Sequence, residues 1–218
     1  MSEFIVFDTT TEYGSLAFFK DRETIFYIEV MLKKSFSELL TPVLELMKKT
    51  EIIDLEDIDF IGVVIGPGSF TGTRIGLSTA KGIAEGLDIP IVPITTFSAL
   101  YKKVSREKNV IPFIDARKKQ VFSEIRVGGK LILPPGSYFP EIVMEKAPKD
   151  SLFIGNGALL YKEKILDSGN RVYENSLFLS KEAGAIALEM YKNGKYFKPY
   201  RLKPIYLRRS DAELNRRK

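Results

Sequence analysis

The sequence of 218 residues contains no cysteine and no histidine. Without cysteine, the chain has no disulfide, no thiolate nucleophile and no metal site with cysteine ligands. Without histidine, it has no Ser-His-Asp triad, no imidazole base and no zinc motif that needs histidine. Any catalysis would therefore depend on carboxylates, lysine, tyrosine, hydroxyl groups or a hard cation held by oxygen atoms.

Long apolar runs are also missing. No stretch reaches the roughly 18 apolar residues of a membrane span, and the opening residues, MSEFIVFDTTTEYG, lack the basic and apolar regions of a signal peptide. Apolar residues make up 44% of the chain, which is enough for a substantial core. We therefore expect a cytoplasmic globular protein with no membrane partner.

The net charge of +5 is unevenly distributed along the chain. Residues 192–218 hold ten Lys or Arg against Asp211 and Glu213 alone, so the remainder of the chain is slightly negative. A basic C-terminal segment of this kind fits contact with RNA phosphates or with an acidic protein. It fits a solvated tail that keeps the protein soluble equally well, and the sequence leaves these readings open.

The spacing of apolar residues predicts an α/β protein whose first half has the order βββαβαβα. Strands are expected at residues 3–8, 14–20, 24–31, 60–66 and 89–94, and helices at 35–51, 71–87 and 96–104. The second half repeats this order in reduced form, with strands at 109–117, 120–127, 130–133, 152–157 and 171–174 and helices at 157–166 and 180–194. We predict two lobes, residues 1–103 and 104–218, divided within the polar stretch at 102–109.

Two stretches are candidates for phosphate binding. In FDTTTEYGSLAFF, Asp8 is followed by a hydroxyl-rich turn, an arrangement that cradles phosphate and places Mg²⁺ in actin-like and sugar-kinase-like ATPases; an ordinary Asx turn explains it equally well. The second stretch, IGPGSFTGTRIG, leads from a strand into a helix whose N-terminus can favour an anion. The candidate phosphate or nucleotide residues are Asp8, Thr9, Thr10, Gly66, Gly68 and Ser69.

The glycine stretch has neither the Walker A spacing nor the G-x-G-x-x-G spacing. No acid, base or set of metal ligands accompanies it, so close packing of backbones is the favoured explanation of its glycines. Further along, Asp115 is followed by Arg117, Lys118 and Lys119, and a carboxylate beside three cations suits an ion pair better than proton transfer. We predict no catalytic residue and no metal ligand.

Several segments together resemble the TsaB (YeaZ) family, a subunit of the bacterial machinery that makes threonylcarbamoyladenosine in tRNA. The matching segments are FDTTTEYGSLAFF, SELLTPVLELM, VVIGPGSFTGTRIGLSTAKGIAEGLDIPIVPITTFSAL, DARKKQVF, FIGNGA and PIYLRR. The resemblance implies the actin-like ATPase (ASKHA) architecture of two ribonuclease-H-like lobes with mixed sheets, the second lobe reduced. It also implies a non-catalytic relative of the TsaD-type transferase, whose metal-binding His-x-x-x-His pair has no counterpart in SFSELLTP, residues 35–42.

The same resemblance implies the partners of this chain. They are a TsaD-type threonylcarbamoyl transferase, a TsaE-type ATPase, a second copy of the chain when it is alone, and tRNA through the complex. No intrinsic cofactor is implied, and nucleotide with Mg²⁺ is expected only within the complex. The first two helices would form the partner surface, the small residues after Thr71 allowing close approach of a partner helix, with contacts from Leu39, Val43, Leu46, Met47, Thr71, Arg74 and Ile75.

An alternative function is an independent ATPase or small-molecule kinase of the actin-like fold. Such an enzyme would need a second phosphate loop of the Asp-x-Gly-Gly-Thr kind in the C-terminal lobe. The nearest candidate, FIGNGAL, has no acidic residue, so the sequence favours the non-catalytic subunit.

Overall fold

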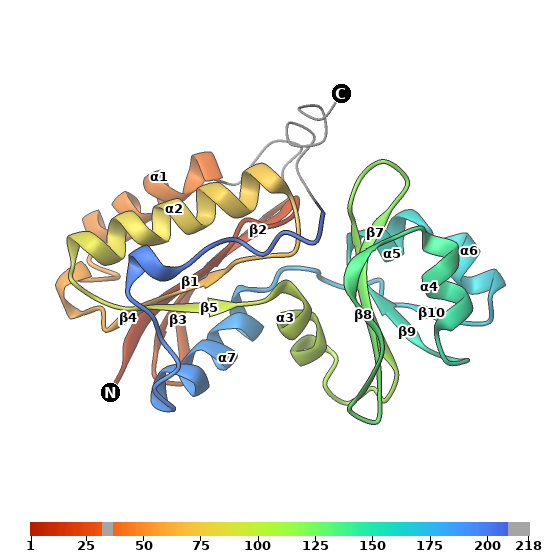
Figure 1. The fold of residues 1–218 in the computed structure, drawn as a ribbon. Helices are drawn as coiled ribbons and strands as arrows, with labels where there is room; N and C mark the ends of the chain where they lie inside the picture. The colour runs from red at the N-terminus through yellow and green to blue at the C-terminus, as the bar shows by residue number, and fades with distance from the viewer. Residues whose placement is uncertain (32–36, 209–218) are drawn as a thin grey trace. The chain divides into compact units, whose positions relative to one another are not determined.

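The computed structural model describes residues 1–31 and 37–208, which form two α/β units. The first unit consists of Met1–Ala99 and Phe178–Ile205, and the second consists of Leu100–Leu177 and the described residues that follow Ile205. Figure 1 shows the course of the chain through its helices and strands.

The first unit is built on a five-stranded mixed sheet with the strand order β3-β2-β1-β4-β5. Its strands are β1 (Glu3–Asp8), β2 (Tyr13–Lys20), β3 (Glu23–Met31), β4 (Phe60–Val64) and β5 (Ile91–Ile94). The first three strands form an antiparallel meander, while β4 and β5 run parallel to β1. The predicted order βββαβαβα is confirmed, because each run of β-branched and aromatic residues pairs as a strand.

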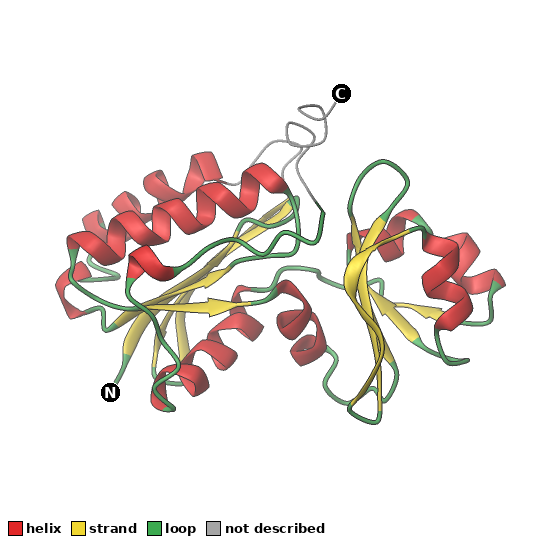
Figure 2. Cartoon of the chain, in the orientation of Figure 1, coloured by secondary structure: helices red, strands yellow, loops and turns green. Residues whose placement is uncertain are grey.

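Helices cover both faces of this sheet. The two long helices α1 (Ser37–Lys49) and α2 (Phe70–Gly86) lie side by side on one face, and α7 (Ser180–Lys192) lies on the other (Figures 1 and 2). Alternate residues of β1 face opposite layers: Phe7 belongs to the core under α1 and α2, whereas Phe4 stacks on Phe60 with ring centres 4.4 Å apart. Phe60 in turn stacks on Tyr191 of α7 at 4.2 Å. Burial on both faces explains the continuous apolar runs of the parallel strands.

The predicted division at residues 103 and 104 is wrong in one respect. The segment Phe178–Ile205 packs on the first unit, because its helix α7 covers the face of the sheet that α1 and α2 leave open. After α7, the backbone of Phe197 exchanges two hydrogen bonds of 2.9 Å with Ile91 at the edge of the sheet. The short 3-10 helix η2 (Pro199–Arg201) follows, and Leu202 enters the core. The basic C-terminal segment, residues 192–218, therefore begins as part of the first unit.

The second unit repeats the topology of the first, with the strand order β10-β9-β6-β7-β8. Its elements are β6 (Val110–Asp115), β7 (Val121–Val127), β8 (Lys130–Tyr138), α4 (Pro140–Lys146), β9 (Leu152–Ile154), α5 (Asn156–Leu160), α6 (Lys162–Asp167) and β10 (Arg171–Val172). Strands β6, β7 and β8 form the meander, and β9 and β10 are the parallel strands. Both units thus have the ribonuclease-H-like strand order, and the predicted actin-like fold class is confirmed.

Two remaining elements complete the description of the chain. The 3-10 helix η1 (Leu55–Asp57) precedes β4, and α3 (Thr96–Lys103) crosses the boundary between the units.

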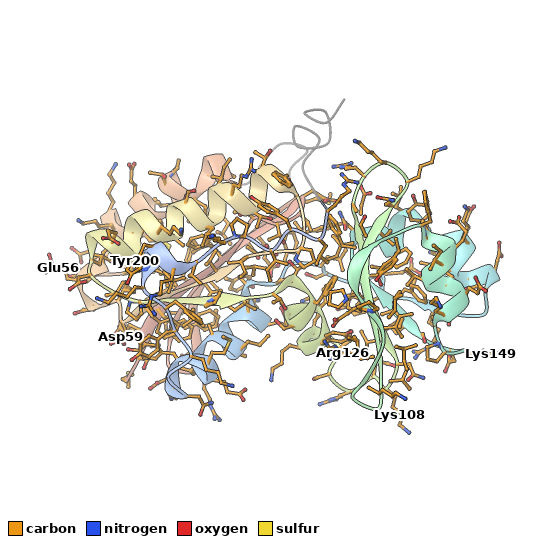
Figure 3. All side chains as sticks on the ribbon, in the orientation of Figure 1. Glu56, Asp59, Lys108, Arg126, Lys149 and Tyr200 are labelled. Atoms are coloured by element: carbon orange, nitrogen blue, oxygen red, sulfur yellow. The ribbon has the colours of Figure 1, made fainter. Side chains whose placement is uncertain are left out.

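Within the second unit, Glu124 on β7 is buried and forms an ion pair with Arg126, which is labelled in Figure 3, through contacts of 2.9 and 3.2 Å. None of the helices in the described part of the chain combines the length and hydropathy that crossing a membrane requires.

Candidate functional site

The two predicted phosphate stretches meet at the carboxyl ends of strands β1 and β4 in the first sheet. Asp8 ends β1, and the loop 65–69 follows β4; because these strands are parallel neighbours, with Phe7 opposite Val63, their carboxyl ends lie together. Open α/β sheets bind their ligands at the carboxyl ends of their parallel strands. The structure therefore brings the six predicted residues into one place.

Hydrogen bonds connect the turn after Asp8 to the beginning of α2. Oδ1 of Asp8 accepts from the backbone N–H of Thr10 at 2.8 Å and from its hydroxyl at 2.7 Å. The hydroxyl of Thr9 donates to the carbonyl of Gly72 at 2.7 Å, and the amide of Ser69 donates to the carbonyl of Thr10 at 2.6 Å. The amides of Thr10 and Ser69, which a phosphate would otherwise use, thus already have acceptors within the protein.

Three glycines of the stretch permit this contact. A Cβ atom at Gly68 would overlap the carbonyl oxygen of Thr10, and one at Gly72 would overlap that of Thr9. At Gly76, it would overlap the hydroxyl of Thr9. The structure accounts for these glycines by packing within the chain, and it corrects the expectation that they receive a partner helix.

The loop is closed from other sides as well. Gly66 has φ of 103°, a left-handed conformation that favours glycine, and its carbonyl accepts from the amide of Thr96 at 2.9 Å. The amide of Ile205 donates to the carbonyl of Ile65 at 2.8 Å. The sequence did not predict that Thr96 or Ile205 contacts this loop. Ile205 does lie in PIYLRR, one of the segments that resemble the TsaB family.

Asp8 is the one residue of the site that packing leaves unexplained. Its side chain is 0% exposed, and its Oδ2 has no hydrogen-bond partner. Burial raises the pKa of the Asp8 carboxyl to about 6, although the two hydrogen bonds from Thr10 act in the opposite direction. A carboxylate oxygen suits Mg²⁺, yet within the described residues no group of three acidic side chains could hold a metal ion.

The predicted partner residues of α1 divide between the surface and the core. Val43 and Met47 are buried, Met47 at 0% exposure, so their assignment to the surface was wrong. They share the inward stripe of the helix with Leu40 and Leu44, as the helical period requires. Leu39 is half-buried, and Leu46 is 55% exposed on the outer side.

The predicted residues of α2 do lie on the surface. Thr71, Arg74 and Ile75 are exposed, and the Arg74 guanidinium lies 4.2 Å from the ring centre of Phe70. In the stretch SFSELLTP, Ser35 and Phe36 lie outside the described residues. A surface with both apolar and charged side chains therefore extends over the outer sides of α1 and α2.

The second unit uses glycine in the same way as the first. A Cβ at Gly155 or Gly157, at the start of α5, would lie 2.6 or 2.7 Å from the carbonyl oxygen of Phe113 near the end of β6. Asp115 ends β6 as Asp8 ends β1, but it is paired with the Arg117 guanidinium at 3.3 Å. The predicted ion pair of Asp115 is confirmed.

The chain is similar to known proteins along nearly its whole length. The family model of TsaD, tRNA N6-adenosine threonylcarbamoyltransferase, matches residues 30–134. The "tRNA threonylcarbamoyladenosine biosynthesis protein TsaB" of Haemophilus influenzae is 26% identical, the match covering 94% of this chain and 92% of that protein. The protein of the same name from Escherichia coli is 27% identical over 95% of each chain.

A solved structure from Pseudomonas aeruginosa, described as an uncharacterized protein with similarity to peptidase YEAZ, superposes with a TM-score of 0.78. It is 25% identical, and the match covers 95% of this chain and all of that one. Sequence and fold together support assignment of the chain to the TsaB (YeaZ) family, to whose members it is similar over nearly its whole length.

Proposed function

We propose that this chain is a non-catalytic subunit of the machinery that makes threonylcarbamoyladenosine in tRNA. In this proposal it binds a TsaD-type transferase, which carries out the chemistry, and a TsaE-type ATPase. The observation that carries the proposal is the similarity over nearly the full chain to proteins named for this biosynthesis. The match of a transferase family model to residues 30–134, the region that holds α1 and α2, supports a common ancestry with the transferase.

The chemistry of the candidate site supports a role without catalysis. The chain has no imidazole and no thiol, and Asp8, the acidic residue that ends β1, has no exposed surface. A general base must come within hydrogen-bond reach of the proton that it removes. Asp8 cannot meet this condition while the turn and the loop are closed over it.

The outer side of α1 and α2 is the surface that we assign to the transferase. Leu46 and Ile75 are large apolar residues with 55% and 36% of their surface exposed, and Arg74 and Thr71 lie beside Ile75 on α2. Apolar side chains and arginine are typical anchors of protein interfaces. A stable contact needs about 1,000 Å² of buried surface, and in the absence of the transferase we expect a second copy of the chain to use the same face.

Substitution of the exposed anchors tests this assignment. We expect Leu46→Glu combined with Ile75→Glu to weaken binding to the transferase by at least about 100-fold, because two charges would be buried against apolar surface. The fold should remain intact, since neither side chain is buried. Binding is measured by calorimetry, and tRNA modification is measured in a reconstituted system.

The control for this experiment is Leu160→Glu, the same change at a site 61% exposed in the second unit. It should leave binding and modification unchanged. The variant with both anchors replaced should lower modification to the level seen when the chain is omitted. Full modification without the chain would refute the proposed function, whereas undiminished binding by the anchor variant would refute only the choice of surface.

An independent ATPase of the same fold is the second candidate, and the unpartnered Oδ2 of Asp8 is the observation that favours it. If nucleotide with Mg²⁺ binds, this oxygen is the one that would face the cation, and opening of the closed loop would have to precede binding. We expect the purified chain to hydrolyse ATP no faster than buffer containing Mg²⁺. Appreciable turnover that Asp8→Asn abolishes would overturn the non-catalytic role.

A further inference from the structure

The turn between β6 and β7 has an unusual backbone for its sequence. Arg117, Lys118 and Lys119 have φ values of 61°, 52° and 59°, so three successive cationic residues are left-handed. Glycine adopts this conformation readily, and asparagine or aspartate does so more often than other residues. The geometry of the turn therefore does not explain why these three positions hold arginine and lysine.

The turn is held in place by its neighbours in the second unit. The amide of Ala116 donates to the carbonyl of Gln120 at 3.0 Å, and the amide of Gln120 donates to that of Arg117 at 3.0 Å. The Arg117 amide donates to Oδ1 of Asp115 at 2.8 Å, and the Ser137 hydroxyl on β8 donates to the side chain of Gln120 at 3.0 Å. Strained backbone that its surroundings maintain in this way is commonly found at functional sites.

Exposed cationic side chains are concentrated at this turn. The Arg117 side chain is 82% exposed, and Lys118 and Lys119 are exposed too. The Arg117 guanidinium pairs with the carboxylate of Asp115. Arg208 adds a further cation, because its Nη1 lies 3.5 Å from the carbonyl oxygen of Arg117. We call these four cations, Arg117, Lys118, Lys119 and Arg208, the basic turn patch.

We propose that the basic turn patch contacts the phosphate backbone of RNA, a role that rests on the proposed function only in naming tRNA as that RNA. Residues 117–120 contain no apolar side chain, and two of the four are lysine, a residue in which protein interfaces are depleted. Exposed Lys and Arg side chains are the groups that neutralise nucleic-acid phosphates and release their counterions. A rigid turn presents these charges in a fixed arrangement, which lowers the entropy that binding costs.

The test replaces the lysines by the residue that the backbone prefers. Lys118→Gly with Lys119→Gly, in the full chain, removes two charges and keeps the left-handed turn accessible. We expect the affinity for tRNA to fall about tenfold at low salt, and the slope of log affinity against log salt to become shallower by about 1.5. The melting temperature should be unchanged or higher, so that lost binding is not confused with lost folding.

The control variant is Lys146→Ala with Lys149→Ala, two exposed lysines of the same unit, of which Lys149 is labelled in Figure 3. It removes the same charge from the end of α4 and the segment that follows it, and it should change tRNA affinity less than twofold. Equal losses in both variants, or no loss in the turn variant, would overturn the proposal. Loss of transferase binding with tRNA binding retained would also overturn it, because the patch would then contact protein. Failure of the proposed function is seen separately, as full modification when the chain is omitted.

Discussion

Gly72→Ala is expected to destabilise the protein by about 3 kcal/mol, whereas Gly82→Ala on the same helix is expected to stabilise it by about 0.5–1 kcal/mol. Both residues lie within α2, which spans Phe70–Gly86. The two substitutions add the same methyl group to the same kind of backbone. The difference in sign comes from what that methyl group meets.

At Gly72, the added carbon would overlap the carbonyl oxygen of Thr9, whose backbone is fixed by strand β1 and by the hydrogen bonds of Asp8. Backbone cannot move aside as the end of a flexible side chain can, so the helix and the turn must separate. Their separation would also lengthen the hydrogen bond from the Thr9 hydroxyl to the Gly72 carbonyl, now 2.7 Å. The predicted loss of stability therefore includes both overlap and a weakened hydrogen bond.

At Gly82, the added carbon would meet no atom within 4 Å outside its own stretch of the helix. Alanine there lowers the conformational entropy of the unfolded chain and leaves every contact in place. Unfolding in urea at neutral pH measures both changes against the original protein. If Gly72→Ala were as stable as Gly82→Ala, the turn after Asp8 would not be in contact with α2.

The order of the helices and strands could be predicted from the sequence, because in most of them the apolar period and the length of the segment indicate the same type of element. The apolar period of α1 and the aromatic strands of the first meander are local signals that the tertiary structure does not override. Helix α4 was missed because it has seven residues, Pro140–Lys146, too few for a period to stand out. Strand β8 continues to Tyr138 beyond the predicted end at residue 133, because Pro134 and Pro135 are tolerated on the edge strand of the sheet.

Contacts between distant segments could not be predicted in the same way. The sequence pattern shows an apolar stripe on α7 but does not say which sheet it covers, so Phe178–Ile205 was placed in the wrong unit. Likewise, α1 has apolar residues outside its inward stripe, such as the exposed Leu46, and Val43 and Met47 were wrongly grouped with them as surface residues. The left-handed turn at Arg117–Lys119 carries no glycine or asparagine to mark it.

The sequence predicted the two segments of the candidate site but did not predict the contact between them. Asp8 and the loop with Gly66 and Gly68 were each identified from residue type. Their meeting follows from parallel pairing of β1 and β4, which a strand order can suggest. That the glycines face the turn after Asp8 depends on the rotation of α2 about its axis, and only the structure gives this.

The second large expected effect is a dependence of the free energy of unfolding on pH, caused by Asp8. The pKa of its carboxyl is raised from 3.8 to about 6 in the folded protein, mainly by burial. A raised pKa means that the folded state binds the proton more tightly than the unfolded state does. The resulting contribution to stability is fully present below about pH 4 and is lost as pH rises through about 6. At 1.36 kcal/mol per pKa unit, the loss is on the order of 3 kcal/mol.

Asp8→Asn should remove this dependence on pH. Asparagine retains an oxygen that can accept the two hydrogen bonds of Thr10, and it carries no charge to bury. Relative to Asp8→Asn, the original protein should lose about 2–3 kcal/mol of unfolding free energy between pH 4 and pH 7. Other carboxylates, such as Asp21 and Glu141, have lowered pKa values and act in the opposite direction, but they are common to both proteins. The difference between the two urea-unfolding series therefore isolates Asp8.

Thr10→Val provides a second measurement on the same carboxyl. The Thr10 hydroxyl donates to Oδ1 of Asp8 at 2.7 Å and lowers its pKa, so its removal should raise that pKa further. The loss of stability should then occur at higher pH than in the original protein, and it should be larger. A difference curve for Asp8→Asn that is flat from pH 4 to pH 7 would mean that water or a cation reaches Oδ2, and that the loop over Asp8 is open in solution. In that case the argument that burial prevents Asp8 from acting on a substrate would no longer hold.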